Sequence, residues 1–375
     1  MKELENLRKE IDEIDAKIVE LYEKRMAVSE EVASYKLATG KNVLDRSREE
    51  AKLNQVRSLT SNDFNEKGIV ELYEQIMSMS RKKQYSLMSQ NGIKGQLPFI
   101  EVDSLVRDNM RVVFQGVRGA YSEAAMTAFF GSDISSFNVG SFRDAMRSVD
   151  EGSANYAVLP IENSSAGIVS ANYDLLSEFE DYIVGEQIIE IDNCLLGLPD
   201  ANEEDIRTVY SHPQALMQSG RYLSLHDWKQ VDYDNTAMAA KKVRDDADKS
   251  QAAVASSRAA ELYGLKIIKR NINFSEGNST RFIVVTNQKI FLKGSGKISI
   301  SFEIPHRSGS LYHILSHFIY NDLNMNNIES RPIPDRPWEY RFFVDFDGNF
   351  NDVAVRNALM GIREETRNMR VLGNY

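Results

Sequence analysis

The sequence lacks any long hydrophobic run. No apolar stretch approaches the roughly 20 residues that span a bilayer, so we expect no membrane partner. Cysteine is nearly absent, and the single Cys194 has no partner for an intrachain disulfide. The first residues, MKELENLRKE, have neither the apolar core of a signal peptide nor the acid-poor, Arg-rich composition of a transit peptide. Together these absences predict a cytoplasmic protein.

A surplus of positive charge is also missing. The chain has 55 acidic and 45 basic residues, a formal net charge of -10. Nucleic-acid-binding faces neutralise phosphates with excess Lys and Arg, so nucleic acid is not an expected partner. At 375 residues the chain exceeds the roughly 100 to 200 residues of one typical domain. Two or three domains are therefore expected.

Residues 1–38 have the alternating three-and-four spacing of apolar side chains that indicates one long helix. These seam residues are Leu4, Leu7, Ile11, Ile14, Ile18, Leu21, Val28, Val32 and Tyr35. Two further helices are expected over residues 45–59 and 66–88. Because a helix of roughly 35 residues is about 50 Å long, the two shorter helices cannot cover it. We expect a homodimer or a higher homo-oligomer.

Charged side chains occupy the inner faces of these helices. Arg25 stands at a seam position, and Lys36 lies about three turns further on nearly the same side. The second and third helices contribute Asp45, Arg48, Glu49, Ser80 and Gln84. A buried, unpaired cation costs several kcal/mol, so anions from the protein or a ligand are required. Either a structural ion-pair network or an anion-binding site fits this pattern.

Residues 4–88 resemble the all-helical chorismate mutase family in the segments LRKEIDEIDAKIVEL, EKRMAVSEEVASYK, DRSRE and SRKKQ. The resemblance implies that the dicarboxylate chorismate rearranges here by restraint and charge stabilisation, with no nucleophile and no cofactor. It places substrate binding at Arg8, Arg25, Arg48, Asp45 and Ser80, and catalysis at Lys36, Gln84 and Glu49. It also implies that Arg8 comes from the partner protomer, and that Lys36 and Gln84 face the ether oxygen.

The sequence pattern changes after residue 88. Residues 89–110 lose the helical spacing and contain Gly92, Gly95 and Pro98, so we predict a linker. Short β-rich runs then alternate with helical stretches, namely RVVFQG, YAVLPI, TVYSHP, AAVAS and RFIVV. This alternation predicts an α/β domain over residues 111–286, with lobes at 111–190 and 191–286.

Hydroxyl and amide groups gather at the strand ends of this domain, where they act as ordinary helix caps or bind carboxylates. The motifs GVRGAYSEAA, PIENSSAGIV, SHPQALMQ, NTAMAA and NSTRF resemble prephenate dehydratase. The resemblance implies that prephenate loses water and CO2 to give phenylpyruvate, with Thr280 as the catalytic hydroxyl. Its implied substrate-binding residues, in a cleft between the lobes, are Ser122, Glu162, Asn163, Ser164, Ser211, Gln218, Arg281 and Phe282.

Residues 297–375 show a βαββαβ order, an α+β arrangement. The motifs SGSLYHIL and IESRP resemble the ACT-type regulatory domain attached to this dehydratase. The resemblance implies that phenylalanine binds there as an inhibitor, at Gly309, Ser310, Leu311, Glu329, Ser330, Arg331 and Pro332. His313 and His317 have metal-ligand spacing, but no third ligand is evident nearby beyond His306, so we expect a solvated helix face and no metal.

The three resemblances follow one another along the chain, and the product of the first site is the substrate of the second. We therefore predict a multidomain, bifunctional enzyme of phenylalanine biosynthesis that phenylalanine inhibits. One alternative is an enzyme with only one live activity, and another is a non-enzymatic amino-acid sensor. Intact Lys36, Gln84 and Thr280 argue against both alternatives.

Overall fold

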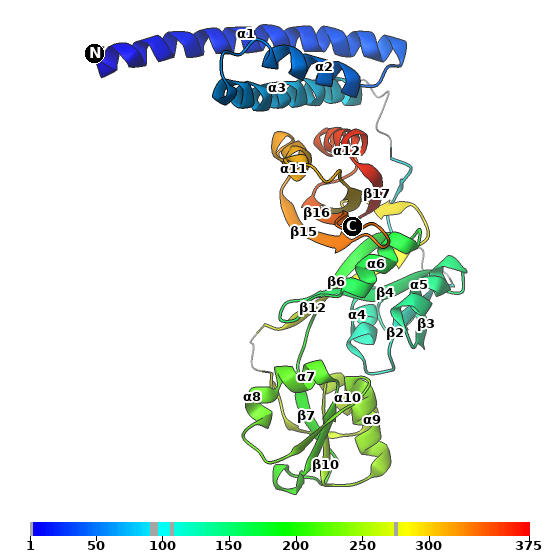
Figure 1. Cartoon of the computed structure of the whole chain (residues 1–375). Coiled ribbons are helices and arrows are strands. Elements are labelled where there is room, and N and C mark those ends of the chain that lie inside the picture. The colour runs from blue at the N-terminus through cyan, green and yellow to red at the C-terminus, as the bar shows by residue number, and fades with distance from the viewer. Residues whose placement is uncertain (1–2, 91–96, 106–108, 274–276) are drawn as a thin grey trace. The chain divides into compact units, whose positions relative to one another are not determined.

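The computed structural model describes residues 3–90, 97–105, 109–273 and 277–375 (Figure 1). These residues divide into two units, which we treat separately. The first unit joins Met1–Pro98 to Gly296–Arg370, and the second joins Phe99–Ser295 to Val371–Tyr375. In the part of the chain that the structure describes, no helix has the length and apolar character needed to cross a membrane.

The first unit begins with the three predicted helices, α1 (Leu4–Thr39), α2 (Arg46–Arg57) and α3 (Asp63–Gln90). Helix α1 ends because Gly40 adopts a left-handed φ of 68° and its N–H bonds to the Lys36 carbonyl. Helix α2 begins after Asp45, whose side chain accepts a hydrogen bond from the Arg48 N–H. The helix prediction is confirmed, although α3 starts at Asp63 rather than at residue 66.

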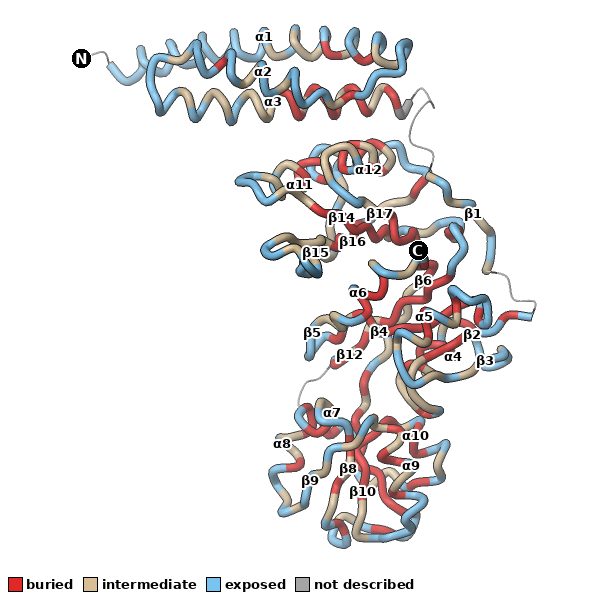
Figure 2. The backbone as a smooth tube through the Cα atoms, turned by 45° about the vertical axis from the view of Figure 1, so that its right-hand side comes forward, coloured by how far each residue is buried: buried red, intermediate tan, exposed pale blue. Residues whose placement is uncertain are grey.

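Helix α1 is too long for its partners, as predicted. Figure 2 shows most of its length as exposed, and only Ser29 and Ala33 of this helix are buried. The seam side chains of Leu4, Ile11 and Ile18 are 62%, 55% and 53% exposed. The two shorter helices therefore leave a stripe of apolar side chains on α1 uncovered.

Residues 297–375 confirm the predicted βαββαβ order. The elements are β14 (Lys297–Glu303), α11 (Ser310–Tyr320), β15 (Met325–Pro332), β16 (Tyr340–Asp347), α12 (Val353–Glu365) and β17 (Arg367–Asn374). The strands follow the spatial order β15-β16-β14-β17, so β15 is an edge strand. Ile298, Ile300 and Phe302 alternate along β14 and are fully buried, which places them on one face of the sheet. Helices α11 and α12 contact each other beside this sheet (Figure 1).

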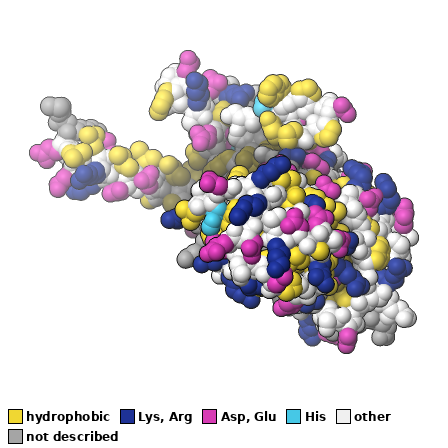
Figure 3. Space-filling view, turned by 90° about the horizontal axis from the view of Figure 1, so that it is seen from below, with side chains coloured by type: hydrophobic (Ala, Val, Ile, Leu, Met, Phe, Trp, Pro, Cys, Tyr) yellow, Lys and Arg dark blue, Asp and Glu magenta, His cyan; other side chains and the backbone are white. Residues whose placement is uncertain are grey.

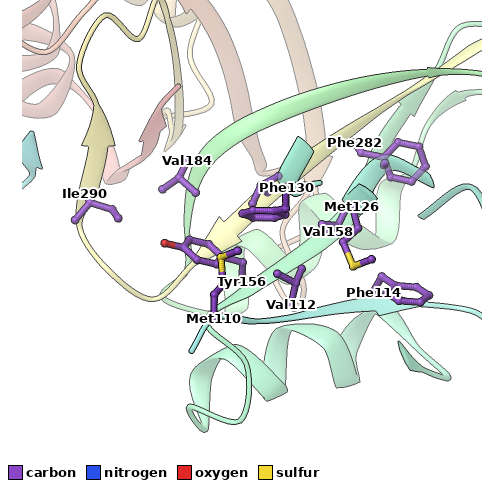
Figure 4. Close-up of a cluster of buried hydrophobic side chains, with 12 residues drawn as sticks. Met110, Val112, Phe114, Met126, Phe130, Tyr156, Val158, Val184, Phe282 and Ile290 are labelled. Carbon is purple, nitrogen blue, oxygen red and sulfur yellow. The ribbon is translucent and has the colours of Figure 1, made fainter. Parts of the chain in front are cut away.

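The second unit contains a first lobe with one sheet in the order β6-β12-β4-β2-β3, with β5 paired to β4. The elements are β2 (Arg111–Gln115), α4 (Tyr121–Phe130), β3 (Ser135–Val139), α5 (Phe142–Asp150), β4 (Tyr156–Asn163), β5 (Gly167–Ile168), α6 (Ser170–Glu178), β6 (Tyr182–Glu190) and β12 (Ser279–Thr286). Figure 4 shows the core of this lobe, where Phe130 and Tyr156 have ring centroids 5.3 Å apart.

The second lobe has its own sheet in the order β11-β7-β10-β8-β9. It comprises β7 (Cys194–Gly197), η1 (Glu203–Asp205), β8 (Thr208–Ser211), α7 (Pro213–Gln218), α8 (Gly220–Leu223), β9 (Lys229–Asp232), α9 (Thr236–Asp246), β10 (Gln251–Ala255), α10 (Ser257–Tyr263) and β11 (Lys266–Lys269). Small alanines, including Ala240, Ala253 and Ala259, fill its core and let the helices pack closely on the sheet. The α/β prediction is thus confirmed.

One predicted lobe boundary is wrong. The second lobe does not extend to residue 286, because β12 crosses back and pairs with β4 and β6 of the first lobe. The predicted linker contains strand β1 (Ile100–Val102), which pairs in parallel with β13 (Ile290–Leu292). These pairings join residues far apart in sequence, which local patterns do not reveal. Gly92 and Gly95 lie outside the described residues.

The surface carries charges of both signs. On the face drawn in Figure 3, Lys and Arg side chains are interspersed with those of Asp and Glu. This mixture agrees with the acidic balance of the whole sequence.

Candidate active sites

The three N-terminal helices enclose a cavity of about 330 Å³ that collects most of the predicted mutase residues. Seven of them line it, namely Arg25, Lys36, Asp45, Arg48, Glu49, Ser80 and Gln84. They come from all three helices, so packing of the bundle creates the site. Arg8 is the exception. It lies on the exposed part of α1, about 26 Å from Arg25 along the axis at 1.5 Å per residue.

Arg25 is held at the wall of this cavity by α3. Its Nη1 donates to the Ser80 hydroxyl and, at 3.4 Å, to the Ile76 carbonyl. Burial lowers the pKa of Arg25 from its ordinary value. A guanidinium that is partly desolvated and fixed by two acceptors is prepared to bind an anionic ligand.

Lys36 also lines the cavity and is held by the turn before α2. Its Nζ donates to the Val43 carbonyl at 2.6 Å, which ties the end of α1 to the turn before α2. Burial lowers the pKa of Lys36, while the charges of Asp45 and Glu364 oppose that shift. The ammonium group has three N–H donors, so this one bond leaves others for a ligand.

Asp45 has a more local role than the sequence indicated. We predicted that it shares a helical face with Arg48 and Glu49, but it lies before α2 as the N-cap. Its Oδ1 accepts from the Arg48 N–H at 3.0 Å and from the Ser47 hydroxyl at 2.8 Å. These hydrogen bonds lower the pKa of Asp45. The carboxylate still lines the cavity, but much of its hydrogen-bonding capacity is used in starting the helix.

Two cationic residues in the cavity wall, Lys52 and Arg81, were missed by sequence reasoning. Arg81 could have been found, because it follows Met77 by four residues and precedes Gln84 by three, and therefore lies on the same face of α3. With both included, the lining has five cations, Arg25, Lys36, Arg48, Lys52 and Arg81, against the two acids Asp45 and Glu49. Because Arg81 is also paired at 2.9 Å with Glu365, which lies outside this lining, the cavity carries an excess of two positive charges.

Gln84 completes the site from α3. Its side chain is only 6% exposed, and its Oε1 has no hydrogen-bond partner among the described residues. A buried amide oxygen without a partner is costly. The amide is thus available to a ligand that fills the cavity.

The predicted dehydratase residues include one tightly bonded group. The Asn163 Nδ2 donates to the Thr280 Oγ1 at 2.9 Å and to the Asn278 Oδ1 at 2.9 Å. The Asn163 Oδ1 accepts from the backbone N–H groups of Ser165 and Ala166 at 3.0 and 2.8 Å, which fixes the orientation of the amide. Because Thr280 accepts this bond, its own hydroxyl hydrogen can be donated elsewhere.

Two further predicted residues lie beside this group. Arg281 Nη2 is 3.3 Å from the Glu162 Oε2, and its Nη1 is 3.5 Å from the Glu186 Oε2. The Ser164 hydroxyl accepts from the Ser279 N–H at 3.0 Å, which helps to hold the β4 end against β12. Pairing of Thr280 with Asn163, and of Arg281 with Glu162, explains why motifs over 100 residues apart meet.

The other predicted dehydratase residues have different surroundings. Ser122 is buried in the first turn of α4. Ser211 and Gln218 belong to the second lobe, where the Ser211 hydroxyl donates to the Val254 carbonyl at 2.6 Å and Gln218 is buried on α7. Phe282 was expected to line the cleft, but it is 2% exposed and packs in the core of the first lobe. It supports the sheet behind the site.

The first predicted regulatory motif lines a cavity, and the second lies on the strand that pairs with two of the wall residues, Tyr340 and Phe342. Gly309, Ser310 and Leu311 line a cavity of about 330 Å³ whose other walls include Trp338, Tyr340 and Phe342. The second motif, residues 329–332, lies on the edge strand β15. Gly309 has a left-handed φ of 80° directly before α11, a conformation that favours glycine.

The expectation of a solvated helix face at His313 and His317 is wrong for His317. This side chain is 1% exposed, and its Nε2 lies 3.2 Å from the Glu365 Oε1. Gly361 of α12 permits this packing, because a Cβ there would lie 2.3 Å from the imidazole ring.

Comparison with known proteins agrees with this two-site arrangement. The family model described as Chorismate mutase type II matches residues 7–85, and the one described as Prephenate dehydratase matches residues 112–290. A solved prephenate dehydratase from Arthrobacter aurescens, in complex with L-Phe, has a TM-score of 0.66 and 28% identity, and the match covers 71% of this chain and 89% of that one. A solved structure described as GqqA, a quorum quenching acylase, has a TM-score of 0.65 and 30% identity, with 70% and 96% covered.

The fold and sites define a two-site enzyme, with a helical mutase domain followed by a two-lobed α/β dehydratase domain. A bifunctional chorismate mutase/prephenate dehydratase from Enterobacter agglomerans is 31% identical over 376 residues, which span 98% of this chain and 95% of that protein. The chain belongs to the bifunctional chorismate mutase/prephenate dehydratase family. It converts chorismate to prephenate and prephenate to phenylpyruvate in phenylalanine biosynthesis, and the predicted bifunctional activity is confirmed.

Proposed function

We propose that the helical cavity is the mutase site and that its surplus of positive charge carries the recognition of chorismate. Chorismate is a dicarboxylate, and guanidinium groups bind carboxylates in pairs of parallel hydrogen bonds. Arg25 and Arg48 bind the two carboxylates, together with Arg8 from the partner. Lys36 and Gln84 donate to the ether oxygen, which gains negative charge as its bond to carbon breaks. Preorganised donors lower the barrier because they need no rearrangement when that charge develops.

The variant Gln84→Ala tests this assignment. Removing one preorganised donor costs on the order of 3 kcal/mol, roughly a hundredfold in rate. Chorismate turnover should fall by about that factor, while dehydration of added prephenate stays unchanged. Lys83→Ala is the matched control, because Lys83 is the preceding residue of α3 and pairs with Glu30 at 2.8 Å on the surface. Equal loss of both activities in Gln84→Ala points to unfolding and removes the assignment.

We also propose that the active protein is a homodimer or a higher oligomer built on α1. The support is the exposed apolar stripe of α1 and the distance of Arg8 from the cavity in its own chain. If Arg8 acts in the partner's site, Arg8→Ala and Gln84→Ala each inactivate the mutase alone. Mixed dimers then contain one intact site and regain activity. No recovery after subunit exchange contradicts a shared site.

For the dehydratase we propose that Thr280 protonates the departing ring hydroxyl of prephenate. Water leaves with that proton, CO2 leaves with its bonding electrons moving into the ring, and the ring becomes aromatic. The support is the Asn163 amide, which donates to the Thr280 Oγ1 and so leaves the hydroxyl hydrogen for the substrate. Arg281 binds a substrate carboxylate in exchange for its contact with Glu162, which lies 3.3 Å away. Ser122, Ser211 and Gln218 complete the site from both lobes.

We further propose that residues 297–375 form an ACT-type regulatory domain that binds phenylalanine and inhibits the dehydratase. The cavity beside Gly309 has aromatic walls, which suit an aromatic side chain. Strand β15 is the last strand in the order of its sheet, and such an edge can meet a second chain. This arrangement brings Glu329 and Arg331 near the cavity of a partner. We place the enzyme in the cytoplasm, since its lone Cys194 is free and buried.

A further inference from the structure

Within the first unit, helix α3 packs against the C-terminal helices α11 and α12. The contact is well buried, because Tyr85 is fully covered and Lys82 is 2% exposed. Lys82 Nζ donates to the Ser316 hydroxyl at 2.7 Å, and the Tyr85 hydroxyl donates to the Glu364 carboxylate at 2.8 Å. The helical segment and the C-terminal segment thus share a specific interface.

One arginine in this interface connects it to the mutase cavity. Arg81 Nη1 lies 2.6 and 2.7 Å from the two carboxylate oxygens of Glu49, and its Nε donates to the Glu365 Oε1 at 2.9 Å. Arg81 is 8% exposed. Charge-assisted hydrogen bonds of these lengths are strong and directional, so Glu49 cannot rotate freely while Arg81 keeps its place.

Glu365 is itself firmly held. Its side chain is 10% exposed and lies 3.2 Å from the buried His317. Burial alone raises the pKa of Glu365, but the neighbouring His317 and Arg81 groups outweigh burial and lower the pKa to about 2. The carboxylate is therefore ionised at neutral pH. Removing it leaves Arg81 with one anionic partner instead of two in a largely dry environment.

We propose that Arg81 is a positioning residue of the mutase site, and that Glu365 of the C-terminal domain holds Arg81 so that it presents Glu49 to the substrate. The mutase site is then completed by the C-terminal domain of the same chain. Glu49 and Arg81 also line a second cavity of about 290 Å³, whose walls include Glu365 and His313. The pair therefore forms a partition between the mutase cavity and the C-terminal domain.

This inference rests on the proposed role of Glu49 in the mutase site. Its physical basis is geometric, because displacement of a catalytic group by about 1 Å can lower a rate roughly a hundredfold. A purely structural ion pair makes a different prediction, since its loss lowers stability without changing the turnover of folded enzyme.

The test uses the full chain and four single variants, with mutase kcat and KM measured per folded protein. Arg81→Gln should lower kcat about 10- to 100-fold with little change in KM. Arg81→Lys should recover only part of the loss, because a lysine cannot bridge two carboxylates in the same fork geometry. Glu365→Gln should lower mutase kcat in the same direction, although Glu365 lies outside the mutase cavity. Lys83→Gln, on the adjacent surface of α3, should leave kcat unchanged.

A double variant separates positioning from independent effects. If Glu365 acts through Arg81, then Glu365→Gln should add little to the loss already seen in Arg81→Gln. If the falls in kcat of the two single variants multiply in the double variant, Glu365 does not act through Arg81, and the proposal is overturned. A rise in KM alone for Arg81→Gln also overturns it, because Arg81 then binds substrate directly. Unchanged mutase kcat in both Arg81→Gln and Glu365→Gln shows a structural ion pair only.

The variant Glu49→Gln tests separately whether Glu49 belongs to the mutase site. Glu49→Gln should strongly reduce mutase kcat if Glu49 belongs to the site. A Glu49→Gln enzyme with normal turnover removes the site assignment and the positioning role together. An inactive Glu49→Gln enzyme beside fully active Arg81 and Glu365 variants removes the positioning role alone.

Discussion

Replacement of Thr280 by valine separates the chemistry of the dehydratase from its stability. Valine matches the shape of threonine and is favourable in a strand, so β12 should keep its pairing. The variant loses the hydroxyl that accepts the 2.9 Å hydrogen bond from Asn163. Asn163 keeps other acceptors, the Asn278 Oδ1 at 2.9 Å and the Ser279 carbonyl at 3.1 Å. The amide is therefore not left unsatisfied.

The two expected effects differ greatly in size. Loss of one hydrogen bond costs about 1 kcal/mol, a small part of the roughly 5 to 15 kcal/mol of a typical domain. Loss of a general acid typically lowers a rate by about 10²- to 10⁴-fold. Thr280→Val should therefore remain folded and convert added prephenate to phenylpyruvate at least about a hundredfold more slowly, with mutase turnover intact.

The assay follows phenylpyruvate formation from prephenate, together with urea unfolding of each variant. Thr286→Val is the matched control, because Thr286 is a buried threonine at the other end of the same strand. The control should keep the dehydratase rate. Near wild-type dehydration by Thr280→Val excludes Thr280 as the general acid. An equal loss of dehydration in Thr280→Val and Thr286→Val excludes it too.

Three other predictions concern pH, assembly and regulation. Burial lowers the pKa of Lys82 from 10.5 to about 8. Between these two pH values the unfolded chain therefore binds more protons than the folded chain. The free energy of unfolding should rise with pH across this window, by about 3 kcal/mol. Lys82→Met should flatten this rise in denaturant titrations, and equal slopes contradict the shift. Ile14→Glu combined with Ile18→Glu should give monomers in ultracentrifugation and abolish mutase activity, whereas persisting dimers exclude α1 as the interface. Replacement of Glu329 and Arg331 by alanine should preserve dehydration and remove phenylalanine inhibition, and undiminished inhibition would mean that phenylalanine competes at the catalytic cleft.

The spacing of apolar side chains along the sequence correctly predicted the N-terminal helices. The stripe from Leu4 to Tyr35 follows the helical period over many turns, and Gly40 directly marks its end. Arg25 was recognisable because a cation interrupts an apolar seam, and the cavity indeed collects it with six other predicted residues. Periodicity is a property of neighbouring residues, so it does not require knowledge of the rest of the fold.

Contacts between distant residues were missed. The partner of Arg81, Glu365, lies 284 residues away in sequence, and no local pattern indicates that the two meet. The return of β12 to the first lobe and the pairing of β1 with β13 are similar cases. Phe282 was assigned to the cleft because it lies in a recognisable motif, whereas its burial depends on strands that are not adjacent in sequence.

If one chain carries two distinct active sites, the two reactions can be blocked separately, and progress curves that start from chorismate show this directly. Purified enzyme receives chorismate, and chorismate, prephenate and phenylpyruvate are measured over time for the wild type, Gln84→Ala and Thr280→Val. The wild type should form phenylpyruvate, Gln84→Ala should leave chorismate unconsumed, and Thr280→Val should accumulate prephenate. If both variants instead stop at the same compound, the two sites as assigned here are contradicted.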